Sequence, residues 1–159
     1  MEIERASEVI IAEAKKFVHS KKLGVISTVS PKGKPESATV LYLLDDNWNL
    51  FFITRNDSRK AANLQINKYV SFVVGTDLGP TTMQMNGEAE QLTDEDRKQF
   101  VNDLAKHSDL NALYYGPFLN LLGINFLLFK VKITWARYLT LNMLQMRETY
   151  YQILSENDL

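Results

Sequence analysis

The sequence contains no cysteine, and this absence excludes several classes of chemistry. A chain without thiols forms no disulfide, has no thiolate nucleophile, and offers no cysteine ligand to zinc or to an iron–sulfur cluster. Histidine is nearly as scarce, because His19 and His107 are the two imidazoles of the whole sequence. We therefore expect no metal site built on several histidines.

Neither sign of charge is in excess. The chain has 18 Lys and Arg residues against 19 Asp and Glu residues, which gives a formal net charge of −1. Proteins that coat nucleic acid need a basic surplus, because their affinity comes largely from neutralising phosphates. The composition therefore predicts no nucleic-acid partner, although it leaves room for one small basic pocket.

Long hydrophobic runs are also missing. The most apolar stretch, residues 118–133, contains Asn120, Asn125, Lys130 and Lys132, and it is shorter than the ~20 apolar residues that a spanning helix requires. The first residues are charged, and no apolar segment of a signal peptide follows them. We expect no membrane partner and a cytoplasmic location.

The chain has 159 residues, of which 45% are hydrophobic and 23% charged, as in an ordinary globular protein. This length predicts a single domain over residues 1–159. Apolar residues at steps of three and four predict a helix over 3–20 and a helical tail over about 143–156. The tail prediction rests on the spacing of Met143, Met146, Tyr150 and Leu154.

Six segments carry the β-branched or alternating pattern of strands. They are residues 23–28, 39–44, 50–54, 70–75, 82–92 and 126–141. Because closure of a sheet removes its unpaired edges, six strands with few, short helices favour a small barrel over an open sheet. We therefore predict a mainly β (α+β) fold, a six-stranded barrel with flanking helices.

The segment 39–44 is apolar on both faces of its strand. One face can fill the barrel, and the other face then needs a cover. A cofactor, a second subunit or a helix of the same chain would each provide one.

Residues 54–61 form the most informative segment. A strand ends at Thr54, and a helix starts near Ser58 with Arg59 and Lys60 in its first turn. Cations at a helix N-terminus are unfavourable by ~0.3–1 kcal/mol each, and a bound anion would remove this conflict. Free backbone N–H groups, two cations and the hydroxyls of Thr54 and Ser58 would together hold a phosphate. The alternative is that Ser58 only caps the helix and the cations extend into water.

In its wider context this segment resembles the pyridoxamine 5′-phosphate oxidase-like family of split barrels that bind flavin mononucleotide (FMN). The family pattern of strand, threonine, short loop, serine, two basic residues, alanine and helix is matched by residues 54–61. Residues 62–75 continue it through the helix and the next strand, and the segment Gly87-Glu-Ala-Glu90 matches a later element. Lys68 replaces the proline that the family usually has. The resemblance covers roughly residues 23–92.

The resemblance implies a split β-barrel and a set of cofactor-binding residues. Arg59 and Lys60 would grip the FMN phosphate, with hydroxyl or capping contacts from Thr54 and Ser58. Ile53 and residues 39–41, on the two preceding strands, would lie along the isoalloxazine, mostly through backbone groups. Near the ring, the family often has a glutamine where this chain has Thr82, and Gln84 on the same strand face is the substitute. The full implied set is Thr39, Val40, Leu41, Ile53, Thr54, Ser58, Arg59, Lys60, Thr82 and Gln84.

The resemblance further implies an FMN-binding oxidoreductase that acts on a small molecule, as a homodimer with flavin at the interface. The arginine-rich C-terminal signature of true pyridoxamine phosphate oxidases is missing from residues 151–159, so oxidation of vitamin B6 is not expected. The sequence identifies neither the substrate nor the electron donor.

Three alternatives stay open within the same fold. The first is a haem-binding or haem-handling protein, which would need an axial ligand, usually a histidine, near the apolar cleft. His19 and His107 each end a predicted helix, where a cation suits the dipole, and neither is well placed for that role. The second is a flavin-binding protein without catalysis, and the third is a protein that binds a deazaflavin.

Overall fold

The computed structural model describes residues 3–75, 79–106, 125–142 and 147–155. Within these ranges the chain forms eight strands and three helices. The strands are β1 Ile3–Arg5, β2 Leu23–Val29, β3 Pro35–Leu44, β4 Asn49–Arg55, β5 Tyr69–Val74, β6 Thr82–Gln91, β7 Phe126–Asn142 and β8 Arg147–Leu154. The helices are α1 Glu8–Ser20, α2 Arg59–Leu64 and α3 Asp94–Lys106.

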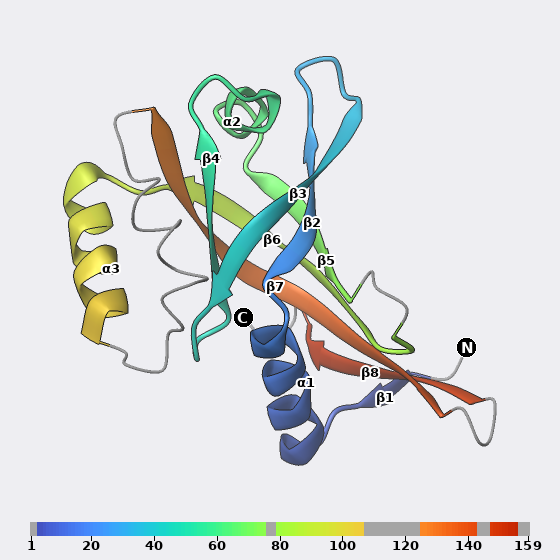
Figure 1. Ribbon diagram of the computed structural model, residues 1–159. Helices are drawn as coiled ribbons and strands as arrows, with labels where there is room; N and C mark the ends of the chain where they lie inside the picture. Colours follow the sequence, from blue (N-terminus) through green and yellow to red (C-terminus); the bar gives the residue numbers. More distant parts are fainter. Residues whose placement is uncertain (1–2, 76–78, 107–124, 143–146, 156–159) are drawn as a thin grey trace.

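The predicted six-stranded barrel is confirmed. The sheet runs β1-β8-β7-β4-β3-β2-β5-β6, and β6 also pairs with β7, so that strands β2 to β7 close on themselves (Figure 1). All pairs within the ring are antiparallel. The long strand β7 holds the barrel together, because its first part pairs with β4 while its second part pairs with β8.

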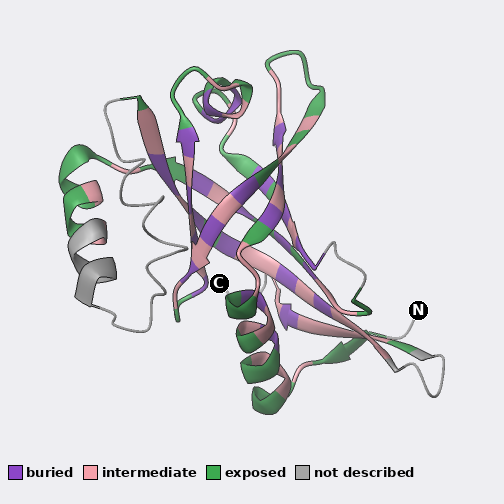
Figure 2. Cartoon of the chain, viewed as in Figure 1, coloured by how far each residue is buried: buried purple, intermediate pink, exposed green. Residues whose placement is uncertain are grey.

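The barrel interior is filled by alternate side chains of each strand. Along β6, Met83, Met85 and Ala89 are buried, as the period-two pattern predicts. The rings of Phe52 and Phe129 stack at 5.4 Å between neighbouring strands. Figure 2 shows this alternation as buried and exposed bands along the strands. Hydrophobic burial of these side chains is the main stabilising term of the fold.

A bulge interrupts the pairing of β6 with β7. Asn86 pairs with Trp135, whereas the next residue, Gly87, pairs with Ile133, so Thr134 has no partner across the ladder. Thr134 and Trp135 consequently break the alternation and are both partly exposed between buried neighbours.

Helix α1 begins at Glu8 rather than at residue 3. Ser7 is its N-cap, and the Ser7 hydroxyl accepts a hydrogen bond from the backbone N–H of Ile10. The helix packs against the barrel (Figure 1), where its Val18 side chain is fully buried and its Val18 carbonyl accepts a 2.6 Å hydrogen bond from the Tyr42 hydroxyl.

The predicted helical tail is wrong over the residues that the structure describes. Strand β8, Arg147–Leu154, runs antiparallel to β7, and β1 adds to its outer edge in parallel. Residues 143–146 and 156, which belong to the same prediction, lie outside the described residues. The segment Thr149-Tyr-Tyr-Gln-Ile153 is rich in β-branched and aromatic residues, which pair well in a sheet and outweigh the helical spacing of a few apolar positions.

Candidate functional site

The predicted phosphate motif lies where β4 ends and α2 begins. Thr54 is the last inward-facing residue of β4, and its Oγ1 lies 2.9 Å from Oγ of Ser58. Ser58 is the N-cap of α2, because its Oγ accepts the backbone N–H of Ala61 at 3.2 Å. The capping role foreseen for Ser58 is therefore confirmed. With six residues, α2 has a small dipole, and side chains provide most of the charge at this corner.

Two of the three cations around this motif are paired inside the chain. Arg55 makes a two-pronged ion pair with Asp57, with hydrogen bonds of 2.8 and 2.5 Å. The Arg55 hydrogen bond holds the pKa of the Asp57 carboxyl below its usual value. Arg59 Nη1 lies 3.2 Å from Oε1 of Glu36 on β3. The chain itself thus supplies an anion to Arg59, which resolves part of the charge conflict expected from the sequence.

Lys60 is the exception. Within the described residues its ammonium group makes no hydrogen bond and no ion pair, and burial lowers its pKa. Lys60 and Arg59 line a small hollow of about 120 Å³ between α2 and the start of β3. The other lining residues are Thr28, Glu36, Ser37 and Ala38. The hollow therefore combines hydroxyl groups with a cation that lacks a counter-charge.

Glu36 and Asn63 belong to this corner and were not predicted from the sequence. Asn63 is 3% exposed, and its Nδ2 donates to Oγ1 of Thr28 at 2.9 Å and to Oε2 of Glu36 at 3.0 Å. These contacts tie α2 to β2 and β3 and hold the Glu36 carboxylate in place. The signal that could have revealed Asn63 is a polar residue on the helix face that also carries the buried Leu64.

The predicted ring-binding residues of β3 and β4 divide between the two faces of the barrel wall. Thr39 and Leu41 lie on the outer face, and Ile53 is also partly exposed there. Val40 and Thr54 are buried inside the barrel. Val40 can therefore touch a ligand on the outer face only through its backbone, which is the type of contact that the resemblance implies.

Thr82 and Gln84 lie elsewhere on the outer face. Thr39 on β3 is the cross-strand neighbour of Val25 on β2, and Val25 is the neighbour of Val73 on β5. Val73 in turn is the neighbour of Gln84 on β6. Three strand spacings of ~4.8 Å put Gln84 about 14 Å from Thr39. The structure thus gathers Thr54, Ser58, Arg59 and Lys60 beside β3. It places the two β6 residues, Thr82 and Gln84, at a second location.

Apolar side chains gather on the outer face at the end nearer α1. Leu23 is 56% exposed and pairs across the sheet with Leu41. Val25 lies between Thr39 and Val73 in the next row, and both valines are partly exposed. The cover expected for the outer face of β3 is therefore not supplied by the described part of the chain.

His19 is not among the residues that line the small hollow. His19 lies in the last turn of α1, where burial holds its pKa below the usual value against the opposing charge of Asp46. His107 lies outside the described residues. The described ranges contain no group of three or more acidic, histidine or cysteine residues arranged to hold a metal, and none of their helices is long and apolar enough to cross a membrane.

Sequence comparison connects the chain with pyridoxamine 5′-phosphate oxidases. The family profile described as "Pyridoxamine 5′-phosphate oxidase" matches residues 10–140. Two pyridoxine/pyridoxamine 5′-phosphate oxidases are similar to parts of the chain. The protein from Psychromonas ingrahamii is 26% identical over 87 residues, which are 55% of this chain and 40% of the relative. The protein from Streptomyces avermitilis is 40% identical over 62 residues, 39% of this chain and 28% of the relative. The matched segments thus span well under half of these relatives.

Structural comparison agrees on the fold. A pyridoxamine 5′-phosphate oxidase-related, FMN-binding protein from Nostoc punctiforme superposes with a TM-score of 0.60 and 17% identity, over 92% of this chain and 96% of that one. A heme binding protein from Mycobacterium smegmatis gives a TM-score of 0.67 and 18% identity, over 93% of this chain and 59% of that one. Proteins named for two different cofactors therefore share this barrel.

Proposed function

The chain belongs to the pyridoxamine 5′-phosphate oxidase family, and from this membership we propose that it binds FMN. The FMN phosphate would occupy the hollow between β3 and α2 that Lys60 and Arg59 line. The FMN-binding protein of the same fold supports this choice of cofactor.

The observation that carries the proposal is the state of Lys60. A partly buried ammonium group without a partner is unfavourable, because it loses hydration and gains nothing in return. A phosphate dianion beside Lys60 would restore the lost interaction and keep the lysine charged. Arg59 would add a second cation by turning from Glu36 towards the phosphate, since its side chain is 81% exposed.

The flavin ring would lie along the outer face of β3. Thr39 and Leu41 present side chains there, Val40 offers its backbone, and Ile53 borders the same face from β4. When bound, the flavin supplies the electron transfer, and the protein supplies binding and orientation. We assign no catalytic acid or base to this chain.

A homodimer accounts for the two residues that lie far from β3. The apolar half of the outer face, with Leu23, Val25 and Leu41, would be covered by a second copy of the chain. The same contact would bring Thr82 and Gln84 of the partner subunit to the flavin, which then lies at the interface. These two residues of the partner subunit would thus complete the flavin site across the two-fold axis.

The reaction that we propose is oxidation or reduction of a small molecule by the bound flavin. A panel of nicotinamide donors and organic acceptors, tested on flavin-loaded protein, would identify the electron donor and the electron acceptor.

Titration of the purified protein with FMN and with riboflavin tests the cofactor assignment. We expect quenching of FMN fluorescence with an affinity at least about 100-fold higher than that for riboflavin, since the phosphate contributes charge-assisted hydrogen bonds. Equal affinities would contradict the phosphate assignment. A Soret band with haem, together with no flavin binding, would instead favour a haem-binding protein, and tighter binding of a deazaflavin nucleotide would identify that cofactor.

A further inference from the structure

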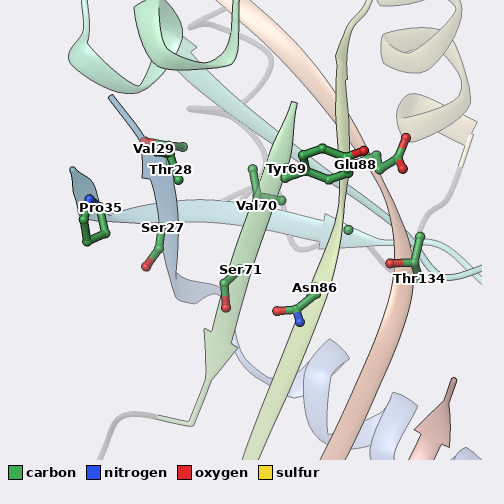
Figure 3. A pocket seen from close by; sticks show the side chains of 11 residues that line it. Ser27, Thr28, Val29, Pro35, Tyr69, Val70, Ser71, Asn86, Glu88 and Thr134 are labelled. Carbon is green, nitrogen blue, oxygen red and sulfur yellow. The ribbon is translucent and has the colours of Figure 1, made fainter. Parts of the chain in front are cut away.

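A second and larger hollow lies on the outer face of β2, β5, β6 and β7 (Figure 3). Its volume is about 660 Å³, within the range of about 300–1,000 Å³ typical of small-molecule sites. The lining residues are Ser27, Thr28, Val29, Pro35, Tyr69, Val70, Ser71, Asn86, Gly87, Glu88 and Thr134. None of the candidate cofactor-binding residues is among them.

The polar side chains of Ser71, Asn86 and Thr134 line this hollow, and they have no hydrogen-bond partner within the described part of the chain. Ser71 and Asn86 are cross-strand neighbours, and Figure 3 shows the Asn86 amide directed towards Ser71. The bulge of β7 adds Thr134, because it leaves this residue unpaired and on the outer face. Each of these groups both donates and accepts hydrogen bonds.

The charges at the rim of the hollow are balanced. The Glu88 carboxylate is paired with Nζ of Lys68 at 2.5 Å, and the same ammonium lies 5.6 Å from the centre of the Tyr69 ring. Tyr69 is 60% exposed. The rim therefore offers an aromatic surface and no uncompensated charge, so a neutral ligand suits it better than an ion.

We propose that this hollow binds a neutral, hydroxylated ring compound of the size of a monosaccharide or disaccharide. Ser71, Asn86 and Thr134 lie on three successive strands, so their polar groups are spread over about 10 Å. A ring with hydroxyl groups on several carbons can meet all three, whereas a single carboxamide is too short to reach all three. The Tyr69 ring would pack against the apolar face of the sugar-like ring, and Val29 and Pro35 add apolar lining.

This site is independent of the proposed cofactor site. The two hollows share Thr28 among their lining residues, but the lysine and arginine of the smaller hollow do not line the larger one. Failure of flavin binding therefore leaves this proposal intact, and failure of this proposal leaves the flavin assignment intact.

The test is a titration of the ¹⁵N-labelled protein followed by amide resonances. The probes are D-glucose, D-ribose, myo-inositol and maltose, with nicotinamide as the planar, single-amide comparison. We expect saturable shifts at Tyr69, Ser71 and Asn86 with at least one cyclic polyol. Asn86→Ala should weaken that binding at least about 5-fold, because it removes one amide from the wall. Asn47→Ala is the matched control, because Asn47 is an exposed residue of the β3–β4 turn that lies outside the hollow.

Three outcomes would overturn the proposal. The first is that none of the polyols gives saturable shifts below about 50 mM. The second is that Asn86→Ala binds as well as the unmodified chain while both proteins remain folded. The third is that FMN displaces the polyol and shifts the same amides, because the hollow would then be part of the cofactor site.

Discussion

Glu36 decides how much positive charge the corner between β3 and α2 offers to a ligand. Its carboxylate accepts hydrogen bonds from Arg59 and from the buried amide of Asn63. In this arrangement Glu36 neutralises Arg59. Of the two cations that line the small hollow, Lys60 is the one without an ion-pair partner in the described part of the chain. A phosphate that enters must therefore compete with Glu36 for Arg59.

Replacing Glu36 with glutamine should strengthen FMN binding. Glu36→Gln removes a negative charge beside the phosphate, and the glutamine oxygen can still accept the Asn63 hydrogen bond. We expect a rise in FMN affinity of about 3- to 10-fold at low salt, and a smaller rise at high salt, where charge interactions are screened. Fluorescence titration at two ionic strengths measures both.

A matched control for this change is Glu90→Gln. Glu90 pairs with Lys130 on the neighbouring strand β7 and does not line the small hollow. Its replacement should leave FMN affinity within about 2-fold. A weaker FMN complex of Glu36→Gln would show that Glu36 assists the ligand rather than competing with it.

The sequence predicts some residues of this corner and not others, for a physical reason. Ser58, Arg59 and Lys60 are neighbours in the chain, so a local pattern reveals them. The contact of Glu36 with Asn63 joins residues 27 positions apart, and only the closed barrel brings them together. Local spacing contains no information on such a pair.

Helix α1 is linked to β7 through Tyr138. The Tyr138 hydroxyl is hydrogen-bonded to Glu13 at 3.3 Å, and burial, aided by the charge of Glu13, raises the pKa of Tyr138 to about 12. A raised pKa means that the folded state holds this proton more tightly than the unfolded chain, whose tyrosines ionise near 10. The contribution of Tyr138 to stability is therefore complete below pH 10 and is lost as the pH rises towards 12.

Urea unfolding of the wild type and of Tyr138→Phe at pH 8 and pH 11 tests this link. Between these two values, the free energy of unfolding of the wild type should fall by about 1.4 kcal/mol more than that of the variant. The same pH dependence in both proteins would show that Tyr138 ionises as freely in the folded state as in the unfolded chain.

Prediction at the level of strands and helices succeeded where one face is buried and failed at the sheet edge. The six barrel strands alternate or are apolar because their inner faces fill the core. Strand β1 has three residues, all exposed, and its pairing with β8 leaves no pattern in the sequence. The start of α1 at Glu8 follows from its N-cap Ser7, a local signal that the spacing of apolar residues does not contain.

The outer face of the barrel is apolar at one end and polar at the other. The end nearer α1 is apolar and includes Leu23, Leu41 and Val73, and the far end is polar and includes Ser71 and Asn86. This division separates the surface that we assign to a second copy from the hollow that we assign to a polyol.

A Leu23→Glu substitution tests the proposed homodimer. Leu23 is 56% exposed, so the folded monomer should tolerate glutamate there. Within an apolar interface the carboxylate would be buried without a partner, which strongly disfavours association. Light scattering after gel filtration at about 20 μM should give twice the chain mass of 18.3 kDa for the wild type and about one chain mass for the variant.

Val9→Glu is the control for this experiment, because Val9 is 75% exposed on α1 and lies outside the apolar face. It should remain dimeric. A monomeric wild type, or a Leu23→Glu protein that stays dimeric, would count against this interface and against a flavin site completed by the partner subunit.

The affinity of Lys60→Met for FMN relative to riboflavin tests the central claim most directly. Methionine keeps an unbranched side chain of nearly the same length and removes its charge, and Lys32→Met in the exposed β2–β3 turn is the matched control. We predict that Lys60→Met lowers FMN affinity at least about 30-fold while riboflavin affinity changes by less than about 3-fold, and that Lys32→Met changes neither. Equal losses for the two flavins, or an unchanged affinity for FMN, would contradict the assignment of the phosphate to Lys60.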